Sequence, residues 1–158
     1  MQRLTASLRL LTSTFAMSLA MAPAWARSAP APAANPASGP AQGPVLSLEL
    51  NAAQPSDKGC RLTFVASNAL GAGLSKAAFE IALFNEAGVV DRLTVLDFKD
   101  LPAGKTKVTR FDLAGADCGK LSRVLINSAT ECAGDGVEPT ACMRALKTLT
   151  KTAIAFGV

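Results

Sequence analysis

Four cysteines are the residues of this chain best equipped for chemistry: Cys60, Cys118, Cys132 and Cys142. Thiols can pair as disulfides, ligate a metal ion or run redox reactions. The sequence contains no Cys-x-x-Cys motif and no histidine, whereas redox pairs and zinc sites usually rely on closely spaced cysteines or on imidazole. We therefore expect two structural disulfides, with no metal site and no cofactor.

The cysteine pairing is open on sequence grounds, because four cysteines permit three connectivities. We favour Cys132 with Cys142, since these two bracket a polar loop, and therefore Cys60 with Cys118, which joins the start of one expected strand to the turn before another. In the chain-entropy model the shorter loop contributes about 2.7 kcal/mol to stability and the longer loop about 4 kcal/mol.

Catalytic groups are scarce. Without histidine, a Ser-His or Cys-His nucleophile pair is excluded. Two carboxylate pairs remain as candidates, Asp97 with Asp100 and Asp112 with Asp117. Acids at strand ends and in turns are usually solvated or cap backbone groups, so we expect no catalytic residue here.

A lysine-activated hydroxyl is the second catalytic candidate. Ser75-Lys76 and Thr148-x-x-Lys151 have suitable spacing, but such a lysine needs burial to lose its proton, and these stretches are polar. A small periplasmic hydrolase or enzyme inhibitor with an acidic or lysine-based site is therefore the alternative function.

Metal binding by acids is also weakly supported. Glu131, Asp135 and Glu138 lie close together in sequence, but they lack the regular Asp-x-Asp spacing of a dedicated calcium loop. Copper sites need soft or imidazole ligands, and Met143 is the one methionine beyond the N-terminal region.

The elements that would position these residues are mostly strands. Apolar and polar residues alternate with period two over residues 46–50, 60–66 and 79–83, the pattern of half-buried strands. Asn85-Glu86-Ala87-Gly88 predicts a hairpin turn with positive φ at Gly88, and a second turn follows at residues 100–104. The remaining expected elements are strands at 89–98, 106–113, 123–127 and 148–156, and one short helix at 139–146.

About seven short strands in a domain of ordinary size favour an all-β fold. We predict an antiparallel β-sandwich of two facing sheets, with one short helix near the C-terminal strand. A barrel is the main competing architecture.

Three stretches carry a resemblance to a known family. They are the strand ending in Ser67-Asn68, the run from Phe79 to Val90, and Leu101-Pro102-Ala103-Gly104-Lys105 leading to Phe111. The sequence over residues 45–128 resembles FxLYD-type, immunoglobulin-like (Ig-like) domains, and it is similar to small exported proteobacterial proteins often catalogued as twin-arginine (Tat) pathway signal proteins. It departs from that label because it has no paired arginines. The resemblance implies an Ig-like fold and no particular chemistry.

The N-terminal region reads as an export signal. Arg3 and Arg9 precede an apolar run at residues 10–22, and Ala24-Trp25-Ala26 offers small residues at a cleavage site. The run is too short for a membrane span, which needs roughly 20 residues. We predict a cleaved signal at 1–26, a disordered Pro/Ala-rich tether at 27–44 and the folded domain at 45–158.

Composition limits the partners. Without Arg3 and Arg9 the formal charge of +4 falls to about +2, and the cations alternate with acids, so nucleic-acid binding is not expected. The sequence predicts a soluble periplasmic protein, with an extracellular location as the alternative and no integral membrane segment after cleavage. Its function would be a non-catalytic Ig-like accessory or interaction module of the cell envelope with an envelope protein as partner. Contacts would use aliphatic, phenylalanine or arginine side chains, or main-chain pairing along an open sheet edge.

Overall fold

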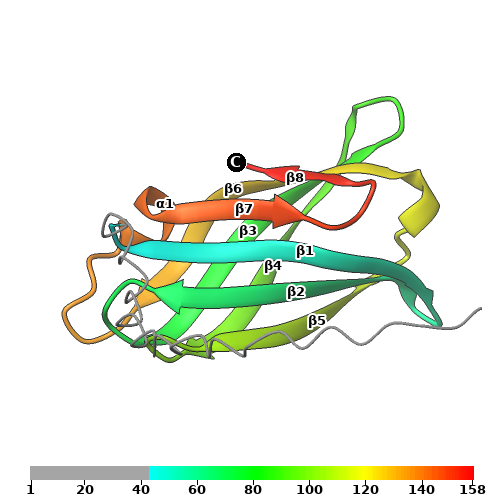
Figure 1. The fold of residues 1–158 in the computed structure, drawn as a ribbon. Helices are drawn as coiled ribbons and strands as arrows, with labels where there is room; N and C mark the ends of the chain where they lie inside the picture. Colours follow the sequence, from blue (N-terminus) through cyan, green and yellow to red (C-terminus); the bar gives the residue numbers. More distant parts are fainter. Residues whose placement is uncertain (1–42) are drawn as a thin grey trace, which may run out of the picture. The chain divides into compact units, whose positions relative to one another are not determined.

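The computed structural model describes residues 43–158 (Figure 1). The predicted signal peptide at 1–26, and all of the predicted tether except Gly43 and Pro44, lie outside the described residues. Within 43–158, no helix is both long and apolar enough to cross a membrane.

Eight strands and two short helices make up the described part of the chain. The helices are a single 3-10 turn, η1 (Cys118–Lys120), and one turn of α-helix, α1 (Ala141–Arg144). The strands are β1 (Val45–Ser56), β2 (Gly59–Ala69), β3 (Leu74–Asn85), β4 (Val90–Leu101), β5 (Thr106–Ala114), β6 (Leu121–Ala133), β7 (Leu146–Thr150) and β8 (Ala155–Gly157).

The strands form two four-stranded sheets, in the orders β5-β2-β1-β7 and β4-β3-β6-β8. Figure 1 shows the first sheet lying over the second. The predicted all-β sandwich is therefore confirmed, with eight strands where about seven were expected. β4 and β5, which are joined by a tight turn, are the edge strands on the same side of the sandwich.

Phenylalanines occupy the middle of the core between the sheets. Phe64 on β2 makes edge-on contacts with three other rings, at centroid distances of 5.6 Å to Phe98, 6.0 Å to Phe111 and 5.4 Å to Phe156. Edge-to-face packing is the favoured geometry for aromatic rings. These contacts join β2, β4, β5 and β8, so they tie the two sheets together.

The C-terminal strand prediction was wrong in detail. Residues 148–156 were expected to form one strand, but the chain leaves β7 after Thr150 and joins the other sheet as β8. Between them, the Thr150 and Thr152 hydroxyls accept hydrogen bonds from the backbone N–H groups of Thr152 and Ile154, both at 3.1 Å. Threonine side chains that satisfy the local backbone compete with strand pairing, and this turns the chain.

The two C-terminal strands depart from the expected antiparallel pattern, which the other four strand pairs keep. β7 pairs with β1 in parallel, and β8 pairs with β6 in parallel. The α-helix is shorter than the 139–146 expected, and β6 is longer than the predicted 123–127 strand. The predicted positive φ at Gly88 is confirmed at 75°.

Candidate protein-interaction surface

Two disulfides fasten the ends of strands. Cys60, at the start of β2, is bonded to Cys118 in η1, and Cys132, near the end of β6, is bonded to Cys142 in α1. This is the connectivity favoured from the sequence. Cys60 and Cys142 are completely buried. All four sulfurs are consumed in bridges between elements, so none is left as a free thiol among the described residues.

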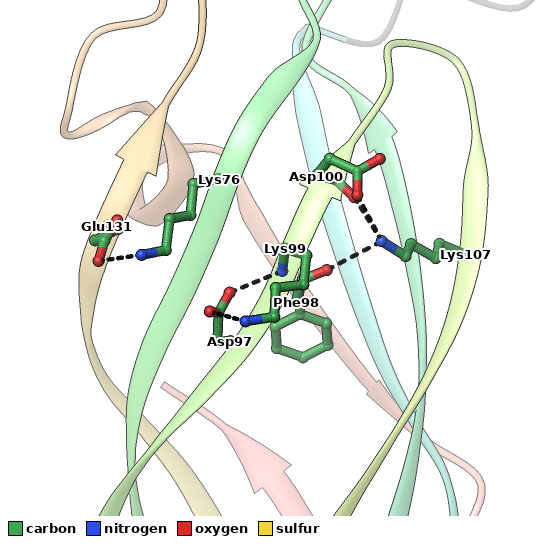
Figure 2. A network of polar contacts seen from close by, with 7 residues as sticks. All are labelled: Lys76, Asp97, Phe98, Lys99, Asp100, Lys107 and Glu131. Atoms are coloured by element: carbon green, nitrogen blue, oxygen red, sulfur yellow. Dashed lines mark hydrogen bonds and ion pairs between the residues drawn. The ribbon is translucent and has the colours of Figure 1, made fainter.

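In the first candidate acid pair, Asp97 and Asp100, each carboxylate is hydrogen-bonded to a different lysine. Asp97 accepts a hydrogen bond from the Lys99 ammonium at 2.6 Å, and Asp100 accepts one from Lys107 at 3.0 Å (Figure 2). Hydrogen bonds from these ammonium groups lower the pKa of Asp97 and of Asp100. Both carboxylates are therefore charged at neutral pH, the wrong state for a general acid.

The carboxylates of the second candidate pair, Asp112 and Asp117, also have separate partners. Asp112 on β5 receives two hydrogen bonds from Arg61 on β2, at 3.0 and 3.2 Å, and this guanidinium lowers the pKa of Asp112. Asp117 caps η1 by accepting the Gly119 N–H at 2.9 Å. Each acid thus holds a neighbouring strand or helix in place.

The lysine-based candidates have structural contacts too. Ser75 donates to the Ala133 carbonyl at 3.2 Å, and Lys76 pairs with Glu131 at 2.8 Å. The hydrogen bond to Glu131 raises the pKa of Lys76, which opposes its use as a base for Ser75. In the other candidate pair, Thr148 lies on β7 opposite Leu48, while the backbone N–H of Lys151 donates to the Leu50 carbonyl at 2.9 Å.

The acids proposed for calcium do not gather. Glu131 is engaged by Lys76, whereas Glu138 lines a hollow of about 330 Å³ beside α1 together with Val137 and Arg144. In the part of the chain that the structure describes, no three acidic, cysteine or histidine side chains converge as a metal site would require.

A second hollow, of about 310 Å³, brings together acids that the sequence did not pair. Asp91 and Asp117 both line it, along with Arg92 and Lys120. Asp91 is bonded to Arg92 at 3.0 Å, and Lys120 approaches Asp117 to 4.0 Å. Every acid in this hollow therefore has a cation beside it, which leaves a surface of paired charges.

The most unusual surface lies on β4. Leu96 and Phe98 of this strand point into the core, and the alternate side chains Leu93 and Val95 point outward with 56% and 50% of their surface exposed. β4 is an edge strand. Large apolar side chains exposed along an edge strand are a recognised aggregation or interaction feature.

Neighbouring strands extend this surface. Ala82 on β3 lies between Leu93 of β4 and Leu125 of β6, and one row further on Phe84 lies between Val90 and Arg123. The Arg123 guanidinium stands 5.6 Å from the centre of the Phe84 ring, within cation–π range. We call the outward apolar side chains of these three strands the β4 face: Val90, Leu93, Val95, Ala82, Phe84 and Leu125. Ala82 is covered by its neighbours, and the charged Glu80 lies beside Val95.

The other sheet also carries exposed apolar side chains, on either side of a charged residue. Val108 on β5 and Leu149 on β7 are also exposed, at 59% and 53%, but they share a cross-strand row with Glu49, which lies between Val65 and Leu149. A charged residue in the middle of the row interrupts the apolar surface. On the β4 face a charged residue, Glu80 on β3, lies opposite Val95, and the uninterrupted apolar row there is Leu93, Ala82 and Leu125.

The C-terminal half of the β4 edge is closed. The Lys107 ammonium, reaching across from β5, donates to the backbone carbonyls of Phe98 at 3.3 Å and Asp100 at 2.9 Å (Figure 2). Lys99 has a φ of 63° and interrupts the register with β3. A lysine and a bulge on an edge strand both oppose pairing with another strand.

The N-terminal half of the edge is regular. From Arg92 to Asp97 each β4 residue faces one residue of β3 without interruption. Because the Phe98 carbonyl points away from β3 toward Lys107, strand alternation directs the backbone groups of Leu96, Thr94 and Arg92 to the same open side. The sequence predicted contact through aliphatic side chains or an open edge, but it could not say which strand would be the edge.

Comparison with known proteins identifies no family. No protein-family profile and no curated protein matches the chain. Among solved structures, the trimeric lipoprotein SadB of Salmonella enterica is similar at 20% sequence identity with a TM-score of 0.39, over 44% of this chain. The match covers 40% of the SadB chain.

Proposed function

We propose that this protein is an exported, non-catalytic accessory or interaction module of the cell envelope, and that the β4 face is its contact surface. One observation carries the proposal: Leu93 and Val95 are half exposed on a regular, uncapped stretch of an edge strand. The predicted signal peptide, periplasmic location and FxLYD-type, Ig-like family membership belong to the same proposal.

The energy available at this surface is appropriate for binding. Full burial of a leucine or valine side chain contributes about 1.5 to 3 kcal/mol, so completing the burial of two half-exposed side chains adds about 2 kcal/mol. Pairing of open backbone groups and cover for Phe84 and Leu125 would add to this. Arginine and aromatic side chains such as Arg123 and Phe84 are favoured in interface centres.

The enzyme alternative has less support. Its candidate acids Asp97, Asp100 and Asp112 each accept hydrogen bonds from a lysine or arginine, and Asp117 caps a helical turn. Its lysine candidate, Lys76, is paired with Glu131. Such groups stabilise a sandwich and supply neither a free base nor a protonated acid.

A site-specific photo-crosslinker tests the proposal. The full chain would carry the photoreactive residue at position 93 and, as the matched control, at position 108, which is equally exposed on the other sheet. We expect defined protein adducts in the native cells from position 93 and not from position 108. Adducts absent from position 93, or of equal yield at both positions, would contradict the proposal.

A further inference from the structure

The open stretch of β4 is bounded on both sides. Toward the C-terminus, Lys107 occupies the Phe98 and Asp100 carbonyls. Toward the N-terminus, the register with β3 shifts between Arg92 and Val90, and the Arg92 guanidinium is held by the Ala114 carbonyl at 2.7 Å. Five residues, Arg92 to Leu96, therefore remain as a regular edge that a further strand could join.

This five-residue edge is complementary to itself. If two copies pair antiparallel with their two-fold axis at Thr94, Leu93 of one copy lies opposite Val95 of the other, and the reverse pair forms on the other side of the axis. Both pairs are on the β4 face. Apolar side chains directly opposite each other across two strands stabilise the pairing.

Charges at the ends of the stretch permit this register. The same axis places Asp91 of one copy opposite Asp97 of the other, and like charges in that position would repel. Each carboxylate is already neutralised within its own copy, Asp91 by Arg92 at 3.0 Å and Asp97 by Lys99 at 2.6 Å.

We propose that the partner at the open β4 edge is a second copy of this chain, joined edge to edge through residues 92–96 in the antiparallel register that sets Leu93 against Val95. This rests on the proposed function, because it names a partner for the same stretch of β4. The pairing would extend β4-β3-β6-β8 into one sheet shared by two copies, and it would set Leu93 and Val95 of each copy against those of the other, with Glu80 on the far side of each Val95.

The size of the contact predicts its strength. Five paired residues span about 17 Å, and such a strip is small beside the roughly 800 Å² per partner that stable interfaces bury. The dimer should therefore be weak and concentration-dependent, which avoids the irreversible association expected of a longer open edge.

Sedimentation velocity on the purified protein over a concentration series tests this. We expect a monomer–dimer equilibrium for the wild type. The Leu93→Lys/Val95→Lys variant should weaken it at least about tenfold, because each introduced ammonium group then faces another. The Val108→Lys variant, altered at an equally exposed position on the other sheet, should associate as the wild type does.

A charge swap makes the test specific to the register. In the Leu93→Lys/Val95→Glu variant, the ammonium group at position 93 of one copy faces the carboxylate at position 95 of the other, so dimers should persist. In a register that sets position 93 against itself, the same variant would place two ammonium groups together. Loss of dimers in this variant, or a wild type that stays monomeric to about 1 mM, would overturn the inference.

The two proposals fail in different ways. A monomeric wild type whose position 93 crosslinks to another protein overturns the second-copy inference and leaves the interaction module standing. A monomeric wild type with no adduct at position 93 overturns both. An adduct at position 93 with the mass of two copies supports both.

Discussion

Asn68 offers the sharpest test of how the sandwich is held together. Its side chain is completely buried at the end of β2. The amide nitrogen donates to the carbonyls of Ala72 at 2.9 Å and Leu101 at 2.7 Å, and the amide oxygen accepts the Leu70 N–H at 3.0 Å. One side chain therefore joins β2, the loop before β3 and the end of β4.

Replacing Asn68 by leucine keeps the approximate size of the side chain and removes all three hydrogen bonds. A hydrogen bond contributes about 1 kcal/mol net, and a buried partner left unpaired costs about 1 to 3 kcal/mol. We expect Asn68→Leu to lower the free energy of unfolding by about 3 to 5 kcal/mol. Against a typical total of about 5 to 15 kcal/mol, this is a large loss.

Urea unfolding followed by far-UV circular dichroism measures this change, since the only tryptophan is Trp25 in the N-terminal region and there is no tyrosine. Asn51→Leu is the matched control, because Asn51 is exposed and its side-chain amide donates to the neighbouring Glu49 at 2.9 Å. It should cost less than about 0.5 kcal/mol. A cost below about 1 kcal/mol for Asn68→Leu would refute the reasoning.

Three further predictions concern the two disulfides, the paired surface aspartates and the close contact between Gly134 and the Gly73 backbone. Replacing both Cys132 and Cys142 by alanine should cost about 2.7 kcal/mol and replacing the other cysteine pair about 4 kcal/mol, measured by urea unfolding; equal costs would contradict the loop-length argument. The paired aspartates have lowered pKa values in the folded protein, so their charged forms stabilise the fold at pH values above the usual carboxyl pKa. This stabilisation is lost as the pH falls through the pKa values of the folded state. The thermal unfolding midpoint should therefore drop on acidification below about pH 4. A midpoint that stays constant from about pH 6 to about pH 2 would contradict the observed pairing of Asp97, Asp100 and Asp112. A methyl group at Gly134 would collide with the Gly73 carbonyl oxygen, whereas one at Gly157 meets nothing, so Gly134→Ala should cost about 1 to 3 kcal/mol in the same assay and Gly157→Ala almost none.

Local pattern was sufficient for the strands whose side chains alternate cleanly. Leu46, Leu48 and Leu50 are all buried on β1, as their period of two requires. The turn at Gly88 was also readable, because a positive φ is a local property of glycine. The cysteine pairing was a preference among three connectivities, based on the polar loop between Cys132 and Cys142, and it is the pairing found in the structure.

Features that depend on tertiary contacts could not be predicted from the sequence. The chain switches sheets between Thr150 and Ala155 because threonine hydroxyls satisfy the backbone there, while hydropathy alone suggested one continuous strand. The edge position of β4 depends on strand order, which involves contacts far apart in sequence. For the same reason Asp91 and Asp117 were not paired in the prediction, although they line one hollow.

The role of Lys107 could not be predicted from the sequence either, because it depends on contacts made in the fold. On the sequence it is one of several alternating charges near a turn. In the fold its ammonium satisfies two backbone carbonyls of the neighbouring edge strand and one carboxylate. Its effect on the length of the open edge is visible only once β4 and β5 are known to lie on the same side of the sandwich.

Amide hydrogen exchange along β4 tests the central claim most directly. At low protein concentration the N–H groups of Arg92, Thr94 and Leu96 should exchange rapidly, because they point to the open edge. At high concentration, pairing between copies should slow exchange at these three positions, while the amides of the other edge strands remain unchanged. Exchange at Arg92, Thr94 and Leu96 that is independent of concentration would contradict the account.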